Sequence, residues 1–268
     1  MATIAELYVR GVRKKFNNYY AAWPPTERFA LGDVGILKRD LFTRVTQLKA
    51  LGISFQTRSK PEPSPIDFVS ESGVSIAFKA AGETRPDLPS IPTAEAGVGI
   101  EFGQEGAFLI KAPESFVSWI EDIATLQKQV RQAYLNGSWY PKWAAIVRLV
   151  TAPHATIMLS QSSQSKIELA AEGQVASGTV DLGEAHINFT VKSQRGDIFQ
   201  TTGAKNVSLL FQLVRIESSY LGLGFDVAVS AGDLSPSPLD FITPQIARAN
   251  PEVANSLYLG GVHHSDEE

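Results

Sequence analysis

Residues 74–79 read VSIAFK and residues 98–102 read VGIEF, and the pattern they share sets the fold class. Large apolar side chains alternate with small or polar ones, which is the two-residue period of a strand with one apolar face. Residues 80–96 between them hold three prolines and predict a loop. The two stretches are therefore expected to be strands of one sheet, joined by that loop.

More strands are expected on both sides of this pair. A strand over 29–37 is expected to turn at Lys38-Arg39-Asp40 into a second one over 41–45. Residues 57–66 contain three prolines and predict an exposed loop or linker. The alternating segments extend over 73–81, 96–111, 178–192 and 196–214. Other strands are expected at 144–151, 156–160, 167–171, 179–192, 207–216 and 225–229.

Two helices are expected among these strands. Apolar residues at three- and four-residue steps predict an amphipathic helix over 2–20, with Arg10, Arg13 and Lys14 on its polar face and Lys15 near the edge. A long central helix is expected over 113–136, with Pro113 in its first turn. The sequence thus predicts an α+β fold with a twisted, mostly antiparallel sheet, an N-terminal amphipathic helix and a long central helix.

Charge is unevenly distributed along the 268 residues, although the net charge is only −4. Up to Lys60 there are about eleven Lys and Arg against about four Asp and Glu, or roughly +7. The residues after Gly232 sum to roughly −5 and include four prolines. These shifts predict a main domain over 1–230 and a Pro-rich acidic tail over 231–268, irregular except for a short helix at 243–249.

Composition and motifs point away from several functions. The chain has no cysteine, which excludes disulfides, cysteine nucleophiles and Cys-based metal sites. A pI of about 5.7 does not suit a dedicated nucleic-acid binder. The four histidines join no catalytic motif, and His154 is expected in a turn after Pro153. We therefore expect no enzyme, cofactor or nucleic-acid partner.

The basic N-terminal helix and the alternating segments each have two interpretations. The basic N-terminal helix is either a cap packed on the sheet with its charges in water, or a surface that docks on anionic lipid. The alternating segments are either half-buried strands of a soluble sheet or precursors of membrane β-strands. Basic residues also stand where a signal peptide needs its apolar core, which predicts a cytoplasmic chain.

The order of these elements resembles the pore-forming domain of gasdermins. An amphipathic basic helix is followed by Leu31-Gly32-Asp33-Val34-Gly35-Ile36-Leu37, and Asp40 to Leu48 looks like a passage of bacterial members. Two alternating strand pairs, 73–82 with 96–111 and 178–192 with 198–216, then flank a helix. The resemblance covers residues 2–230.

The resemblance implies a cytoplasmic precursor that becomes membrane-associated once a protease or partner protein activates it. Its lipid contacts would be Arg10, Arg13, Lys14 and Lys15, with Lys38 and Arg39 as weaker candidates. Acidic lipids would be its partners, and a homo-oligomer would form the pore. The cysteine that bacterial members lipidate is absent, and the inhibitory segment would be the short tail. The alternatives are a soluble α+β interaction or regulatory module without membrane activity, and an enzyme whose site the spacing does not reveal.

Overall fold

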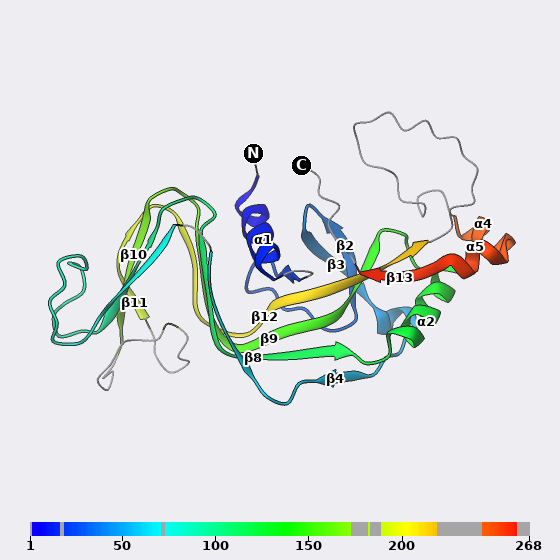
Figure 1. Ribbon diagram of the computed structural model, residues 1–268, viewed down its shortest axis with the longest axis horizontal. Coiled ribbons are helices and arrows are strands. Elements are labelled where there is room, and N and C mark those ends of the chain that lie inside the picture. The colour runs from blue at the N-terminus through cyan, green and yellow to red at the C-terminus, as the bar shows by residue number, and fades with distance from the viewer. Residues whose placement is uncertain are drawn as a thin grey trace. The chain divides into compact units, whose positions relative to one another are not determined.

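The computed structural model describes residues 2–16, 19–70, 73–172, 182, 189–218 and 243–261. The chain forms two compact units (Figure 1). Unit 1 comprises Met1–Phe29, Ser59–Val117 and Val150–Leu210, and unit 2 comprises Ala30–Arg58, Ser118–Leu149 and Phe211–Glu268. Within the described residues the α+β class is confirmed, and the strand pairs with a recorded register are antiparallel.

Unit 1 contains the N-terminal helix and the alternating strands. Helix α1 (Ile4–Lys15) confirms the predicted amphipathic helix, with shorter bounds. The small sheet of unit 1 has the order β11-β10-β7-β6. Its strands are β6 (Val74–Lys79), β7 (Gly97–Phe102), β10 (Ser165–Ala171) and β11 (Phe189–Arg195). The other strands of the unit are β1 (Tyr20–Ala21), β5 (Ser64–Val69) and parts of β4 (Thr57–Ser59), β8 (Phe108–Ile120), β9 (Trp143–Ser160) and β12 (Ile198–Ser218).

The alternation of β6 and β7 is explained by the two faces of this small sheet. Val98, Ile100 and Phe102 point into a core that also receives Ile167 and Leu169 from β10. The small and polar residues between them lie on the opposite face, because successive side chains of a strand alternate. Ile76 is directly opposite Ile100, which is in turn opposite Ile167. The predicted pairing of the two alternating stretches is therefore confirmed.

Unit 2 is built on a hairpin, a helix and a C-terminal strand. The hairpin strands are β2 (Asp33–Lys38) and β3 (Leu41–Gln47), followed by the 3-10 turn η1 (Leu48–Leu51). Arg39 and Asp40 have φ of 49° and 62°, which suits a two-residue turn within the predicted turn at Lys38-Arg39-Asp40, since Lys38 is paired with Leu41. The Asp33 carboxylate is buried, and it accepts hydrogen bonds from the Ala30 N–H at 2.8 Å and the Gln47 amide at 2.9 Å.

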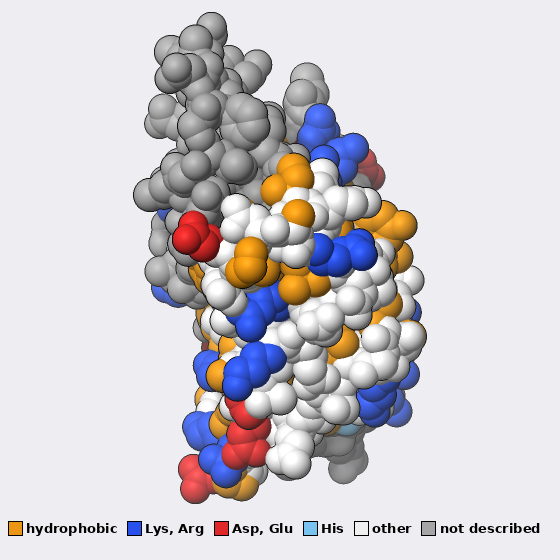
Figure 2. Space-filling view, turned by 90° about the vertical axis from the view of Figure 1, so that its right-hand side faces the viewer, with side chains coloured by type: hydrophobic (Ala, Val, Ile, Leu, Met, Phe, Trp, Pro, Cys, Tyr) orange, Lys and Arg blue, Asp and Glu red, His pale blue; other side chains and the backbone are white. Residues whose placement is uncertain are grey.

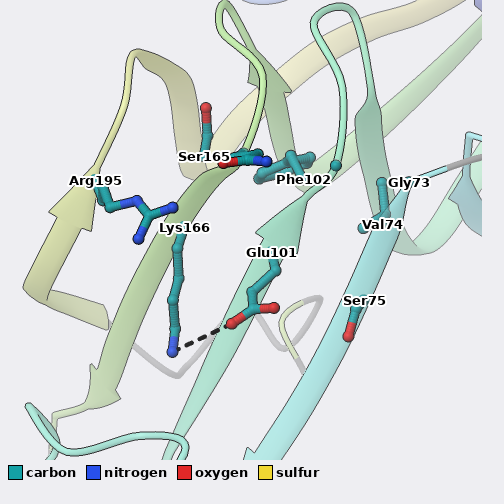
Figure 3. A pocket seen from close by; sticks show the side chains of 10 residues that line it. Gly73, Val74, Ser75, Glu101, Phe102, Ser165, Lys166 and Arg195 are labelled. Atoms are coloured by element: carbon teal, nitrogen blue, oxygen red, sulfur yellow. Dashed lines mark ion pairs between the residues drawn. The ribbon is translucent and has the colours of Figure 1, made fainter.

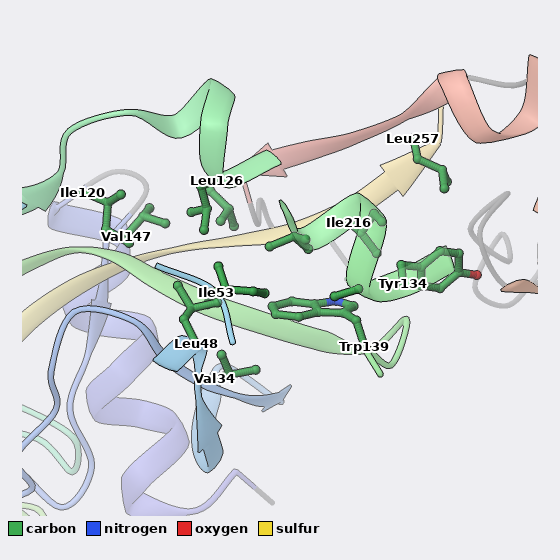
Figure 4. Close-up of a cluster of buried hydrophobic side chains, with 14 of the residues drawn as sticks. Val34, Leu48, Ile53, Ile120, Leu126, Tyr134, Trp139, Val147, Ile216 and Leu257 are labelled. Atoms are coloured by element: carbon green, nitrogen blue, oxygen red, sulfur yellow. The ribbon is translucent and has the colours of Figure 1, made fainter. Parts of the chain in front are cut away.

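The core of unit 2 includes residues from the C-terminal tail. Helices α4 (Pro244–Ala249) and α5 (Pro251–Ser256) are followed by β13 (Leu257–Gly261), which pairs with Val214 to Ser218 of β12 (Ile198–Ser218). Ala247, Val253 and Leu257 are at most 1% exposed and join the cluster around Trp139 and Tyr134 (Figure 4). The short helix at 243–249 is confirmed, but α5 and β13 were not predicted. The domain boundary at 230/231 lies outside the described residues and stays a prediction.

The central helix begins later than predicted. Helix α2 spans Ile123–Leu135, with Asp122 as the N-cap whose carboxylate accepts from the Thr125 N–H at 2.9 Å. Pro113 belongs instead to strand β8 (Phe108–Ile120). The β5–β8 pairing shifts register between Ser64 and Ile66, opposite this proline. A bulge needs no donor from the residue it leaves unpaired, so proline is tolerated there.

Three further expectations are corrected. Residues 57–66 are not a plain loop, because they contain β4 (Thr57–Ser59) and the start of β5, both paired with β8. The segment 96–111 is divided between β7 and β8 by a turn at 103–107. The expected turn at His154 is part of one continuous strand, β9 (Trp143–Ser160). The expected strand at 225–229 and most of that at 179–192 lie outside the described residues.

Candidate lipid-binding surface

Helix α1 is fixed at one end by a cap and along one face by burial. The Thr3 side chain accepts from the Glu6 N–H at 3.3 Å, while the Glu6 carboxylate accepts from the Thr3 N–H at 2.7 Å. This capping box uses the acidic residue of the first turn, and Arg13, Lys14 and Lys15 occupy the last turn. Both ends therefore complement the helix dipole.

The buried face of α1 lies on aromatic rings. Tyr8 meets Phe108 edge-on with ring centroids 5.3 Å apart, and Phe68 lies 5.2 Å from Phe108. Phe16, just after the helix, meets Phe68 at 5.3 Å. Burial also raises the pKa of the Tyr8 hydroxyl, which keeps this side chain neutral. The aromatic support holds the basic turn in one position relative to β5 and β8 within unit 1.

Gly11 lets the helix approach Phe108 closely, because a Cβ at this position would lie 2.5 Å from Phe108 Cε1. Gly11→Ala is expected to lower the free energy of unfolding by about 1–2 kcal/mol, since overpacking outweighs the roughly 1 kcal/mol of helix propensity gained. Urea unfolding measures the change. In the Phe108→Leu background, Gly11→Ala should lower the free energy of unfolding much less. A stabilising Gly11→Ala in the native background would contradict this close packing.

The four predicted cations of α1 are not equivalent. Arg10, Lys14 and Lys15 are exposed, whereas Arg13 is only partly exposed. The Arg13 guanidinium donates to the Tyr20 hydroxyl at 2.6 Å and lies 4.4 Å from that ring's centroid. Lys15 Nζ lies 5.6 Å from the centroid of the Phe68 ring. Arg13 therefore has a structural contact that its placement on the polar face did not predict.

A groove of about 240 Å³ runs beside the basic turn. Lys14 and Lys15 line it on the helix side, and Gln104, Glu105 and Gly106 line it from the turn between β7 and β8. No sequence motif predicts this groove, because it depends on the turn folding against Leu7 and Gly11. The two lysines are therefore the predicted lipid contacts that the structure places beside a concave surface.

Lys38 and Arg39 belong to unit 2 and are exposed at the β2–β3 turn. Both flank or form a two-residue turn, whose backbone geometry fixes the direction in which their side chains leave the hairpin. They stay weaker predicted lipid contacts.

A second concavity, of about 430 Å³, lies at one end of the small sheet and is lined by residues of all four of its strands. One of its cations is paired in place, because Lys166 Nζ lies 3.3 Å from the Glu101 carboxylate (Figure 3). The same ammonium lies 3.3 Å from the Glu168 carboxylate. Basic side chains are also spread singly over the face shown in Figure 2, among apolar and polar ones. The basic turn of α1 differs because its cations are consecutive on one element.

One of the four histidines lies within the residues that the structure describes. His154 lies in β9, while His186, His263 and His264 lie outside the described residues. None of the helices in the described ranges is long and apolar enough to cross a bilayer. The prediction that the chain is not an enzyme stays a prediction.

The fold and this surface define the chain as an α+β protein with largely antiparallel sheets and a basic N-terminal helix. No protein-family model and no curated protein matches it. A cryo-EM structure of the gasdermin A3 membrane pore is similar to it, with 10% sequence identity and a TM-score of 0.31. The similarity covers 88% of this chain and 98% of that one.

Proposed function

We propose that this chain is the precursor of a gasdermin-like, membrane pore-forming protein that acts in cell death. The exposed cations of α1 bind acidic lipid, and a protease or partner protein activates the chain. Copies of it then assemble into a closed β-barrel in the membrane. Closure is required because an open sheet edge in lipid leaves backbone groups without hydrogen-bond partners.

The observation that carries this proposal is the division of α1 into two faces. One face is buried on aromatic rings, and the other presents Arg10, Lys14 and Lys15 to solvent. Each basic residue near an anionic membrane surface contributes about 1 kcal/mol of binding. Three of them on a rigid helix provide about 3 kcal/mol without any unfolding of unit 1.

The strands of the small sheet supply a second, independent support. Their apolar residues lie on one face and their small or polar ones on the other, which is also the pattern of a membrane β-strand. Transfer to a barrel would keep this alternation and exchange the protein core for lipid on the apolar face.

The proposal is tested by dye release from vesicles of phosphatidylserine and phosphatidylcholine, compared with vesicles of phosphatidylcholine alone. The full chain is compared with a full chain that carries a protease site at residue 230 and is cut while both pieces are retained. Release is expected from acidic vesicles only, and mainly after cutting.

Two results would contradict the proposal. One is absence of release by both the intact and the cut chain, with circular dichroism showing that both are folded. The other is equal release from neutral and acidic vesicles. If the chain binds neither kind of vesicle, the soluble interaction module becomes the better explanation.

A further inference from the structure

The segment between β6 and β7, residues 80–96, is folded back over the small sheet, and we call it the strap. It is drawn in teal beside β10 and β11 in Figure 1. Its two ends are tied by a hydrogen bond from the Gly82 N–H to the Thr93 carbonyl at 2.7 Å. The strap therefore has a defined structure of its own, although its prolines predict only a loop.

Lys79, the last residue of β6, fastens the end of the strap. It is 1% exposed, and its ammonium donates to the carbonyls of Pro92 at 2.9 Å, Thr93 at 3.4 Å and Glu95 at 2.6 Å. An ammonium has three donors, so this cage satisfies it completely. A buried charge without such partners would be strongly destabilising, so the cage and the lysine depend on each other.

Leu88 and Ile91 hold the middle of the strap on the backbone of β7. They form a buried cluster with Ala170 of β10. The positions beneath them are glycines: a Cβ on Gly97 would lie 2.7 Å from Ile91 Cδ1, and a Cβ on Gly99 would overlap Leu88 Cδ2. Gly97 and Gly99 of β7 therefore make room for the strap.

Polar contacts attach the strap to the two strands beyond its own hairpin. Lys166 of β10 donates to the Asp87 carbonyl at 2.6 Å, and Glu168 accepts from the Ser90 N–H at 3.0 Å. Lys192 of β11 pairs with Glu95 at 2.9 Å. Within the strap, the hydrogen bond from Arg85 lowers the pKa of Asp87 to about 2. The strap thus joins β6, β7, β10 and β11 in one arrangement.

This arrangement limits the length of the strands. Strands β6 and β7 have six residues each, whereas a membrane-spanning strand needs about 9–11. Lengthening this hairpin at its closed end, beyond Lys79 and before Gly97, must therefore use residues from both ends of the strap, including those whose carbonyls surround Lys79.

We propose that the strap is a latch that keeps the small sheet in its short-stranded form, and that its release from Lys79, Gly97 and Gly99 is a required step before the β6–β7 hairpin can lengthen at its closed end. The proposal rests on the proposed function for its role in membranes. The latch itself is a property of the folded chain in water, so it is tested separately.

The first experiment measures amide hydrogen exchange at Gly82, Ser90 and Glu95 in the full chain without lipid. Lys79→Met should speed this exchange by about tenfold or more, because it removes charged hydrogen bonds while keeping the apolar stem. Gly99→Ala should do the same with Lys79 intact, by displacing Leu88. Lys60→Met, at an exposed lysine of the same unit, is the matched control and should change nothing. Exchange in both latch variants equal to the control would overturn the latch.

The second experiment locks the strap in the full chain cut at residue 230. Because the chain has no cysteine, Ser90→Cys and Glu168→Cys can be joined selectively with a cleavable bismaleimide. Locking should leave binding to phosphatidylserine vesicles unchanged and reduce dye release about tenfold or more, and cleavage of the linker should restore release. Equal release by the locked and unlocked chains would overturn the latch and leave the pore function intact. No release by the unlocked chain would overturn the proposed function instead, whatever the exchange data show of the latch.

Discussion

Replacement of Arg10, Lys14 and Lys15 together by glutamate is expected to abolish binding to acidic vesicles. Neutralising three cations removes roughly 3 kcal/mol, or about 150-fold in affinity, and reversing them adds repulsion. Arg13 is left in place because its guanidinium packs on Tyr20. Co-sedimentation with phosphatidylserine vesicles measures the loss. Raising the salt concentration should also weaken the binding of the native chain to these vesicles.

A matched control separates position from total charge. Lys60, Arg195 and Lys205 are exposed basic residues of the same unit but do not belong to α1. Their triple replacement by glutamate changes the net charge equally and should retain most of the binding. Glutamates in the last turn oppose the helix dipole, so an unfolding curve must show that the α1 variant is folded. Equal loss in both triple variants would contradict a specific role for α1.

Deletion of residues 243–261 is expected to unfold unit 2. The deletion removes the strand paired with Val214 to Ser218 and three core residues that are at most 1% exposed. Burial of an aliphatic side chain contributes about 1.5–3 kcal/mol, so the total loss is comparable to the stability of a whole domain. Trp139, 2% exposed in the same cluster, makes the loss visible as a shift in tryptophan fluorescence.

Two smaller changes to the same region serve as controls. A chain that ends at residue 261 keeps β13 and should unfold at the native urea concentration. Leu257→Ala should cost about 2–4 kcal/mol by leaving a cavity. A chain that lacks 243–261 yet unfolds with the native midpoint would show that these residues are dispensable. If they are not, a cut near residue 230 leaves β13 in place until it separates from β12, so cutting and release are different events.

Much of the fold follows from the spacing of apolar residues. The period of Val74, Ile76 and Phe78 identified β6, and the partner strand was equally clear. The steps between apolar residues identified α1 in the same way. These patterns are reliable because each reflects one buried face, and burial of that face is what stabilises the element.

The errors occurred where one residue type suits two structures. Pro113 and Glu114 are favourable in a first helical turn, yet here they lie in a strand at a bulge. The true start of α2 had a signal of its own, because Asp122 is a good N-cap residue with Thr125 three positions later. Phe116 and Ile120 fit the helical stripe by chance, since four residues is also an even number of strand positions.

The candidate site was predicted in its residues but not in its environment. Arg10 and Lys14 were predicted on the polar face of the helix and Lys15 near its edge, and all three are exposed, while their role in lipid binding stays a prediction. The contact of Arg13 with Tyr20, the groove beside Lys14 and the cage around Lys79 were not predicted. Each of these depends on where a turn or loop returns to the sheet, and backbone carbonyls such as those of Pro92 and Glu95 have no sequence signature.

The last strand of unit 2 is synthesised well after the last residue of unit 1. Unit 1 draws on residues up to Leu210, whereas unit 2 needs β13, about fifty residues later. At about 5–20 residues per second, a ribosome takes roughly 3–10 s to add that difference. During this interval the nascent chain has every segment of unit 1, including the basic helix and the latch, while the core of unit 2 still lacks its last strand.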